Sequence, residues 1–273
     1  MTALPASLVL VGAGKMGGAM LQGWLALGLE AGRIAVLDPY ASPELTALCA
    51  GAGVRLNPPS AVMKAPDVLV LAVKPQSFDA AASSVALLVG EATLVLSIMA
   101  GKTIGDIAAR LPKTGTFVRA MPNFPASIGR GITAAVASGA VTPRAHAMAD
   151  ALLSAIGKVE WLDHEGLIDA VTAVSGSGPA YVFYLVECLA AAGVAAGLPA
   201  DLALRLARAT VEGAGELMAR DPASPPTRLR ENVTSPGGTT AAALSVLMGQ
   251  DGLEKLMTDA VAAAKRRAQE LAG

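Results

Sequence analysis

The sequence predicts an α/β fold, in which a doubly wound, largely parallel sheet is followed by an all-helical domain. Two observations predict it. Short apolar runs alternate with helical patterns through the first part of the chain, which is the alternation of βαβ units. Strand signals almost disappear after about residue 160, and long helical patterns replace them. We therefore expect one domain at residues 1–161 and a second, all-helical domain at residues 162–273.

Six apolar runs are the expected strands. The first, Leu8–Val11, is apolar at every position, as is typical of a strand buried on both faces of a parallel sheet. The second, Ile34–Leu37, is followed at once by Asp38. The remaining four are Val54–Leu56, Val68–Val73, Thr93–Ile98 and Thr116–Ala120.

The expected helices carry their own end signals. The first covers Lys15–Leu27 with Gly28 as its C-cap, and the second begins after Ser42 as N-cap with Pro43 in the first position. In the second half of the chain we expect helices at about 166–175, 178–196, 200–219, 239–248 and 251–271.

The composition is apolar: 53% of the 273 residues are hydrophobic, 16% are charged, and the mean hydropathy is +0.52. The charged fraction lies well below the roughly 25% of an ordinary soluble domain. This composition excludes a disordered chain and raises the question of a membrane span, which needs about 20 mainly apolar residues. The most apolar stretch, Ala180–Ala200, carries only Glu187 as a charge but is interrupted by Gly193, Gly197 and Pro199. We interpret it as a helix buried in protein and expect no membrane partner.

Charge, cysteine and histidine content exclude further classes of protein. The net charge is −1 and the one basic cluster is Lys265-Arg266-Arg267, so we expect no nucleic-acid partner. Cys49 and Cys188 are isolated in apolar surroundings and the chain begins without the basic region of a signal peptide, so we expect a cytoplasmic protein. His146 and His164 match no zinc spacing, and no metal site is expected.

A phosphate-binding turn follows the first strand. The residues Gly12, Ala13, Gly14, Lys15, Met16 and Gly17 form G-x-G-x-x-G and open a helix, as in a Rossmann-like dinucleotide-binding unit. Gly12 permits the tight turn, Gly14 lets a pyrophosphate approach the backbone, and Gly17 lets helix and strand pack closely. The helix that begins at Lys15 and Met16 directs its free N–H groups at the phosphates.

Asp38 bears on the choice of nicotinamide cofactor. An acid at the end of the second strand usually accepts hydrogen bonds from the adenosine ribose, which favours NADH. The residues Pro39-Tyr40-Ala41-Ser42 that follow include no base for the 2′-phosphate of NADPH. The alternative is that Asp38 is a loop residue that turns away from the site.

Two loops of small residues lie in the helical half. Ser235-Pro236-Gly237-Gly238-Thr239-Thr240 precedes an Ala- and Leu-rich helix, and its bare backbone N–H groups suit a carboxylate. Ser175-Gly176-Ser177-Gly178-Pro179 opens the long apolar helix. Each loop has the alternative of being only a cap and a tight turn. Neither contains a nucleophile elbow, a carboxylate pair or an HExxH motif, which disfavours chemistry that needs a strong base and favours hydride transfer from a cofactor.

Five segments in order resemble one known family. The most specific is Leu229–Thr240 (LRENVTSPGGTT), and the others are Ser175–Tyr181 (SGSGPAY), Ala72–Gln76 (AVKPQ), Arg119–Asn123 (RAMPN) and the glycine turn. The chain resembles pyrroline-5-carboxylate reductases over essentially its whole length. This resemblance implies a Rossmann-like N-terminal domain, an all-helical dimerisation domain, and reduction of 1-pyrroline-5-carboxylate to L-proline with NADPH or NADH.

The resemblance also implies roles for the residues at matching positions. Gly12–Gly17 hold the pyrophosphate. The nicotinamide side is lined by Ala72, Val73, Lys74, Pro75, Met99, Ala100, Met121, Pro122 and Asn123. The substrate is bound by Ser177, Ser235, Gly237, Gly238, Thr239 and Thr240, with Thr240 as the catalytic residue beside the ring nitrogen. Because the helical domains of this family interlock, the 235–240 loop can serve the cofactor of a partner subunit.

Two departures and the alternatives stay open at this point. Phe124 stands where the family usually has Thr. The segment after Asp38 lacks the polar or basic residues typical of NADP users. Asp38 therefore favours NADH, while the resemblance favours NADPH. The alternatives are another imine reductase, a β-hydroxyacid-dehydrogenase-like oxidoreductase, or a dinucleotide-sensing regulator. A β-hydroxyacid dehydrogenase would need a lysine in its helical domain, and none lies between Lys158 and Lys255.

The excess of apolar residues in the helical half predicts a partner. A domain of about 110 residues has too little interior to bury several helices that are apolar nearly all round. We therefore expect a homo-oligomer whose helical domains pack against one another.

Overall fold

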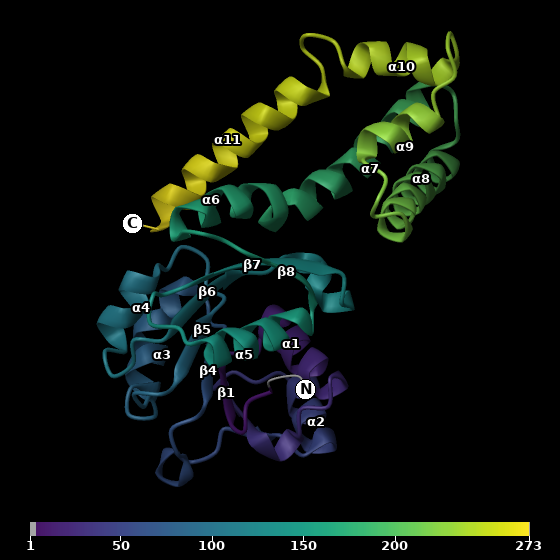
Figure 1. Cartoon of the computed structure of the whole chain (residues 1–273). Helices are drawn as coiled ribbons and strands as arrows, with labels where there is room; N and C mark the ends of the chain where they lie inside the picture. Colours follow the sequence, from purple (N-terminus) through teal and green to yellow (C-terminus); the bar gives the residue numbers. More distant parts are fainter. Residues whose placement is uncertain (1–3, 273) are drawn as a thin grey trace. The chain divides into compact units, whose positions relative to one another are not determined.

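The computed structural model of the chain describes residues 4–272 and shows two compact units (Figure 1). The first unit runs to Gly176 and takes in the segment from Lys265 onward, and the second is Ser177–Ala264. The last strand ends at Trp161, so the first unit continues for 15 residues beyond the residue at which the sequence predicts the end of the first domain. Each unit is described below by itself.

An eight-stranded sheet in the order β3-β2-β1-β4-β5-β6-β7-β8 forms the centre of the first unit. Its strands are β1 (Leu8–Val11), β2 (Ile34–Leu37), β3 (Arg55–Leu56), β4 (Val68–Leu71), β5 (Leu94–Ser97), β6 (Phe117–Met121), β7 (Gly131–Ala137) and β8 (Gly157–Trp161). Only β6 and β7 pair antiparallel among these strands. Leu8 of β1 lies beside Ile34 of β2 and Val68 of β4, so the three strands end at one edge. The predicted Rossmann-like fold class is confirmed, and each of the six predicted strands is present.

The sequence patterns missed β7 and β8, and the structure explains why. The strand β7 (GITAAVA) consists mostly of alanine and glycine, which have weak strand propensity. In β8, the edge strand, exposed Lys158 and Glu160 alternate with half-buried residues, which is how proteins discourage pairing with other chains. Gly157 has φ +143° and lies so close to Gly131 that a Cβ atom would overlap the Gly131 carbonyl. Only glycine therefore fits where these two strands begin.

Helices cover both faces of the sheet (Figure 1). One face packs against α1 (Lys15–Ala26), α2 (Pro43–Ala52) and α5 (Pro143–Ser154), and the other packs against α3 (Phe78–Val85) and α4 (Ile104–Arg110). Alternate residues of β1 enter the two cores, Leu8 and Leu10 on the first side and Val9 and Val11 on the second. This is the pattern of a strand buried on both faces.

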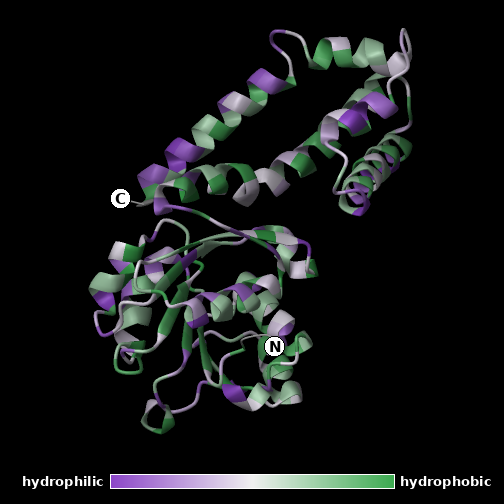
Figure 2. Cartoon of the chain, in the orientation of Figure 1, coloured by the Kyte–Doolittle hydropathy of each residue, from purple (hydrophilic) through white to green (hydrophobic). Residues whose placement is uncertain are grey.

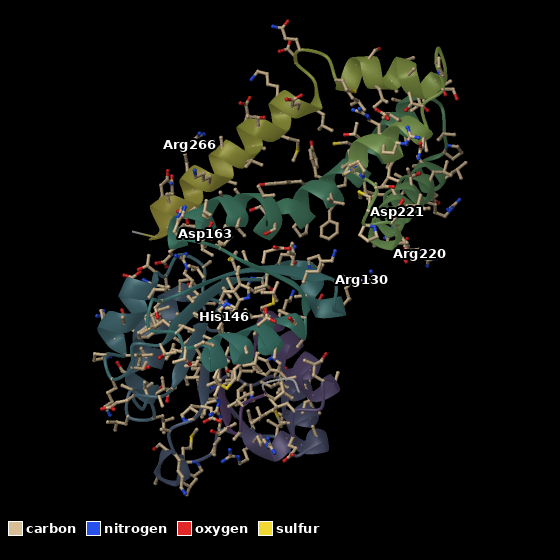
Figure 3. All side chains as sticks on the ribbon, in the orientation of Figure 1. Arg130, His146, Asp163, Arg220, Asp221 and Arg266 are labelled. Atoms are coloured by element: carbon tan, nitrogen blue, oxygen red, sulfur yellow. The ribbon has the colours of Figure 1, made fainter. Side chains whose placement is uncertain are left out.

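The helix ends and two tryptophans tie these layers together. The Ser42 hydroxyl accepts a hydrogen bond from the Leu45 backbone N–H at 3.2 Å, as the sequence predicts. The C-cap of α1 is Leu27 and not the predicted Gly28, which follows it with φ +87°. The indole N–H of Trp24, in α1, donates to the carbonyl of Leu152, in α5, at 2.8 Å. Trp161 stacks on His146, which is labelled in Figure 3, with 3.7 Å between ring centroids.

Short helices complete the first unit. The 3-10 helices are η1 (Ala31–Arg33), η2 (Ser60–Val62), η3 (Pro75–Ser77), η4 (Phe124–Ile128) and η5 (Glu165–Leu167). After η5 the chain continues through α6 (Ile168–Val171) into a π-helix, η6 (Thr172–Gly176). Single π-turns of this kind are frequent at functional sites.

The second unit is entirely helical. It contains α7 (Gly178–Ala195), α8 (Ala200–Arg220), α9 (Pro226–Asn232), α10 (Thr239–Leu247) and the first part of α11 (Leu253–Ala272). Gly193 of α7 lies so close to Ala203 of α8 that an added Cβ would be 3.1 Å from the alanine Cβ. Helix α8 ends at Arg220, beside Asp221 (Figure 3). The short helix α9 was not predicted; the other helices match their predicted ranges to within a few residues.

Helix α7 exposes apolar side chains along its length. It is predominantly hydrophobic in Figure 2, and none of its residues is buried within the chain. Among the described residues one helical stretch, Glu165–Ala195, is long and apolar enough to cross a membrane by length and composition alone. The sequence predicts that this helix is buried in protein, but the chain by itself leaves it exposed.

Candidate active site

The carboxyl ends of four strands place the predicted cofactor residues along one edge of the sheet. The chain order reverses between β1 and β4, and ligands of doubly wound sheets bind at this switch point. The backbone N–H of Ala72, just after β4, donates to the carbonyl of Val11 at 2.8 Å. Ala100 follows β5, and Pro122 follows β6, on this same edge. The structure therefore brings these separated sequence motifs together.

The three glycines of the turn have three different surroundings. Gly12 has φ +82°, and a Cβ there would lie 2.8 Å from Val73 Cγ1. A Cβ on Gly17 would overlap the carbonyl oxygen of Gly12, so helix and strand pack as closely as predicted. By contrast, a Cβ on Gly14 would meet nothing within 4 Å. The backbone at Gly14 is thus open to a ligand, while Gly12 and Gly17 are required by the protein itself.

The N-terminus of α1 is free to bind an anion. Gly14 is its N-cap, no side chain caps it, and its first turn, which includes Lys15 and Met16, contains no acidic residue. Unpaired N–H groups and the positive end of the helix dipole therefore face outward, as pyrophosphate binding requires. A cleft of about 420 Å³ opens here and extends toward Asp38 and the N-terminus of α2. These residues fit a dinucleotide.

Asp38 turns toward the phosphate-binding turn. Its Oδ2 accepts a hydrogen bond from the Ala13 backbone N–H at 2.8 Å, and its Oδ1 accepts one from the Tyr40 N–H at 2.9 Å. Asn57 fixes the backbone of Asp38 with two further hydrogen bonds of 2.8 Å, one from each end of its side-chain amide. The carboxylate is therefore held in a single orientation along the cleft wall.

The predicted nicotinamide-side residues differ in their surroundings. Lys74 is an exposed residue at the start of η3. Met121 lies against Gly176 of the π-helix: an added Cβ on Gly176 would be 3.1 Å from Met121 Cε. Phe124, at the start of η4, is 54% exposed. Its ring therefore faces outward in the chain and does not enter the core.

Asn123 uses both ends of its side chain within the protein. Its Nδ2 donates to the carbonyl of Ser175 at 3.1 Å, and its Oδ1 accepts from the Ile132 backbone N–H at 2.9 Å. Only 9% of the residue is exposed. Predicted as a cofactor residue, Asn123 has a structural function that the sequence did not indicate.

A buried ion pair joins the sheet to the helical segment that follows it. Arg119 in β6 donates to Glu165 Oε1 at 2.7 Å, and that oxygen also accepts from the Ile104 backbone N–H, at the start of α4, at 2.8 Å. The Arg119 side chain is 4% exposed and that of Glu165 is 29% exposed. Sequence reasoning gave neither residue a role of this kind, although a single Arg inside an apolar strand is a signal that it has a partner.

The predicted substrate residues lie in the second unit. Ser235 and Gly238 close a turn in which the Gly238 N–H donates to the Ser235 carbonyl at 3.0 Å, and Gly237 has φ +69°. Helix α10 begins at Thr239 with no side-chain cap, and Thr240 is half-buried in its first turn. Ser177 precedes α7, and its hydroxyl makes no cap hydrogen bond. The 235–240 turn is thus a second uncapped helix N-terminus, of a size suited to a carboxylate.

Within residues 4–272 no three His, Cys, Asp or Glu side chains are placed to hold a metal ion.

Comparison with known proteins decides the family. Residues 165–271 match the family model described as pyrroline-5-carboxylate reductase dimerisation, and residues 7–101 match NADP oxidoreductase coenzyme F420-dependent. The chain is 40% identical to the pyrroline-5-carboxylate reductase of Pseudomonas aeruginosa over 97% of its own length and 96% of that protein. The chain belongs to the pyrroline-5-carboxylate reductase family. It is also 46% identical to the Synechocystis enzyme over 75% of each chain.

Solved structures of family members share the whole architecture. The chain matches a pyrroline-5-carboxylate reductase from Coxiella burnetii with a TM-score of 0.90 and 34% identity, covering 98% of this chain and 99% of that one. It matches the Plasmodium falciparum enzyme with NADP bound with a TM-score of 0.80 and 25% identity, covering 98% of each chain. The predicted family is therefore confirmed.

Proposed function

We propose that this protein reduces 1-pyrroline-5-carboxylate to L-proline with a nicotinamide cofactor. One observation carries the proposal. The chain matches a member of this family over nearly its whole length, and it has both the glycine turn of the cofactor site and the uncapped 235–240 turn. The protein is an NAD(P)H-dependent oxidoreductase that acts on a C=N bond. We also propose that it works in the cytoplasm.

The 235–240 turn binds the substrate carboxylate in this proposal. The first N–H groups of α10 have no side-chain cap, and Gly237, where an added Cβ would meet nothing within 4 Å, keeps the approach to them open. Ser235, Thr239 and Ser177 add hydroxyl groups that can donate or accept. Thr240, in the first turn of α10, directs its hydroxyl to the ring nitrogen and orients the imine. Because a protonated imine is already activated, no strong general acid is required from the protein.

The cofactor is held by the first unit. Gly12, Gly14 and Gly17 and the N-terminus of α1, with Lys15 and Met16, receive the pyrophosphate. Residues along the carboxyl ends of β4, β5 and β6 border the nicotinamide: Ala72, Val73, Lys74, Pro75, Ala100, Met121, Pro122 and Asn123. When bound, NAD(P)H supplies the hydride that reduces the C=N bond. The hydrogen bonds of Asn123 hold the end of β6 in position for this contact.

We propose NADH as the preferred cofactor. Asp38 is aligned along the cleft by Ala13 and Asn57, where it can accept hydrogen bonds from the adenosine ribose hydroxyls. A 2′-phosphate would bring negative charge next to this carboxylate.

We propose a homodimer as the smallest functional assembly. Apolar residues of α7 that the chain leaves exposed, such as Phe183 at 55% and Leu185 at 46%, lie within the segment that matches the dimerisation family. In such an assembly the 235–240 turn can serve the cofactor of the partner subunit.

Steady-state assays with pyrroline-5-carboxylate and each reduced cofactor test this function. We expect oxidation of both cofactors, with a higher kcat/KM for NADH. Absence of NAD(P)H oxidation with this substrate would contradict the proposal. Nucleotide binding without turnover would favour a dinucleotide sensor, and turnover with a β-hydroxyacid alone would favour the dehydrogenase alternative.

A further inference from the structure

The cleft beside the phosphate-binding turn carries two carboxylates. It is lined by Gly14 and Lys15 of the turn and α1, and by Asp38, Tyr40, Ser42 and Glu44 from the end of β2 to the start of α2. The charged residues of this lining are one lysine and two carboxylates, and the lysine belongs to the first turn of α1, where the pyrophosphate binds. No arginine lines the cleft among the described residues, although a 2′-phosphate site usually offers one.

The N-terminus of α2 is already supplied with oxygen atoms by the protein. Its N-cap Ser42 accepts a hydrogen bond from the Leu45 backbone N–H at 3.2 Å, and Glu44 stands in its first turn. A carboxylate there complements the positive end of the helix dipole. This helix end faces the same cleft as Asp38. An incoming phosphate would therefore meet the Ser42 hydroxyl and the Glu44 carboxylate, which already interact with the N-terminus of α2.

Glu44 is negatively charged at neutral pH. A hydrogen bond from the Ser42 side chain, followed by one from its own backbone, lowers the pKa of this exposed carboxyl from its ordinary value. Removing the charge therefore requires a substitution, since a moderate change of pH does not neutralise it.

We propose that Glu44 is a second determinant of cofactor choice, which acts with Asp38 to weaken the binding of the 2′-phosphate of NADPH in this cleft. Asp38 selects through the ribose hydroxyls, while Glu44 selects through charge at the α2 N-terminus. The inference rests on the proposed function in one respect, namely that NAD(P)H binds in this cleft.

Equilibrium binding in the absence of substrate tests it. The Kd values of NADH and NADPH are measured by nicotinamide fluorescence for the wild-type chain, Glu44→Gln, Glu44→Arg and the matched control Glu91→Gln, an exposed glutamate that does not line the cleft. We expect Glu44→Gln to tighten NADPH binding by roughly 3- to 10-fold, because removal of a nearby like charge lowers a screened Coulomb repulsion. Glu44→Arg should tighten it further. NADH binding should change by less than about 2-fold in each variant.

Salt dependence and a fragment ligand sharpen the result. The gain in NADPH affinity should shrink as NaCl rises, because the repulsion is screened. Adenosine 2′,5′-bisphosphate should gain affinity in the same variants while 5′-AMP does not. An unchanged ratio of NADPH to NADH affinity in Glu44→Gln and Glu44→Arg, with both cofactors bound by the wild type, would overturn this inference and leave the proposed function standing. If the wild type binds neither cofactor, the proposed function itself fails.

Discussion

The side chain of Asn123 links the end of β6 to the π-helix through a 3.1 Å hydrogen bond from its Nδ2 to the carbonyl of Ser175. The same amide accepts from the Ile132 N–H at the start of β7, so one residue connects three segments of the first unit. This arrangement fixes the end of β6, where the nicotinamide-side residue Met121 lies, and Pro122 directly after it.

Asn123→Ala should therefore lower both stability and cofactor affinity. Leaving the Ser175 carbonyl and Ile132 N–H without their partner costs roughly 1–3 kcal/mol of the free energy of unfolding. Urea unfolding and NADH titration measure the two effects. The control is Ser83→Ala, which removes only a local, exposed hydrogen bond to the Asp79 carbonyl. Wild-type stability in Asn123→Ala would show that the clamp is dispensable.

Gly17→Ala and Gly14→Ala should separate folding from ligand binding. The Gly17 Cβ would overlap the Gly12 carbonyl, so we expect a loss of about 1–3 kcal/mol of stability from overpacking. The Gly14 Cβ meets open space, so Gly14→Ala should keep its Tm and still weaken NAD(P)H binding. Thermal denaturation with and without cofactor checks both. Equal Tm losses in the two variants would contradict the different roles assigned to them.

Thr240→Ala should impair the chemical step without weakening cofactor binding. By comparison with the loss of one oriented donor at an oxyanion site, we expect kcat/KM to fall by roughly 10²–10³-fold, while Thr240→Ser keeps much of the activity. Thr210→Ala is the control, because its hydroxyl donates only to the Leu206 carbonyl on an exposed part of α8. An unchanged kcat/KM for Thr240→Ala would remove Thr240 from the mechanism.

Glu165→Gln should destabilise the first unit. It leaves the guanidinium of Arg119, whose side chain is 4% exposed, without its carboxylate, and breaking a buried pair in this way costs about 3–5 kcal/mol. Because the Glu165 side chain is 29% exposed, we expect the lower end of that range or less. Asp79→Asn breaks the exposed pair with Arg110 and should cost much less, because solvent and salt screen an exposed ion pair. Similar losses in the two variants, measured by urea unfolding, would contradict the importance of burial.

Light scattering after size exclusion should show a homodimer or a larger homo-oligomer at micromolar concentration. Phe183→Asp places a charge on the exposed apolar surface of α7 and should shift the chain toward smaller species. Leu87→Asp is the control, since Leu87 is 87% exposed and belongs to the first unit. A stable wild-type monomer would refute the expected assembly.

Local patterns predicted those parts of the fold that depend on neighbouring residues. The glycine turn, the Ser42 cap and the buried runs of β1 and β4 each have a short, readable signature. The strands β7 and β8 lack one, because alanines and edge charges do not resemble a buried strand. Their place in the sheet is decided by distant partners.

Most residues of the candidate site could also be predicted from local patterns, but the contacts that hold these residues in place could not. The residues expected to touch ligands lie in compact motifs at the ends of strands and helices. Asn123 donates to Ser175, which lies 52 residues away, and Arg119 pairs with Glu165, which lies 46 residues away, so no local pattern could indicate these two contacts. Glu44 went unnoticed because an acid in the first turn of a helix is common for helical reasons alone.

The two tryptophans make the protein its own optical reporter. Trp24 is fully buried in α1, the helix whose N-terminus opens the cofactor cleft, so its emission is shielded from water-soluble quenchers, and we expect energy transfer to lower it when a reduced nicotinamide cofactor binds. Trp161 is half-buried against His146 at the edge strand β8, so its emission should respond to water-soluble quenchers. A single emission spectrum can therefore follow cofactor occupancy and the state of the sheet edge separately, with no label added.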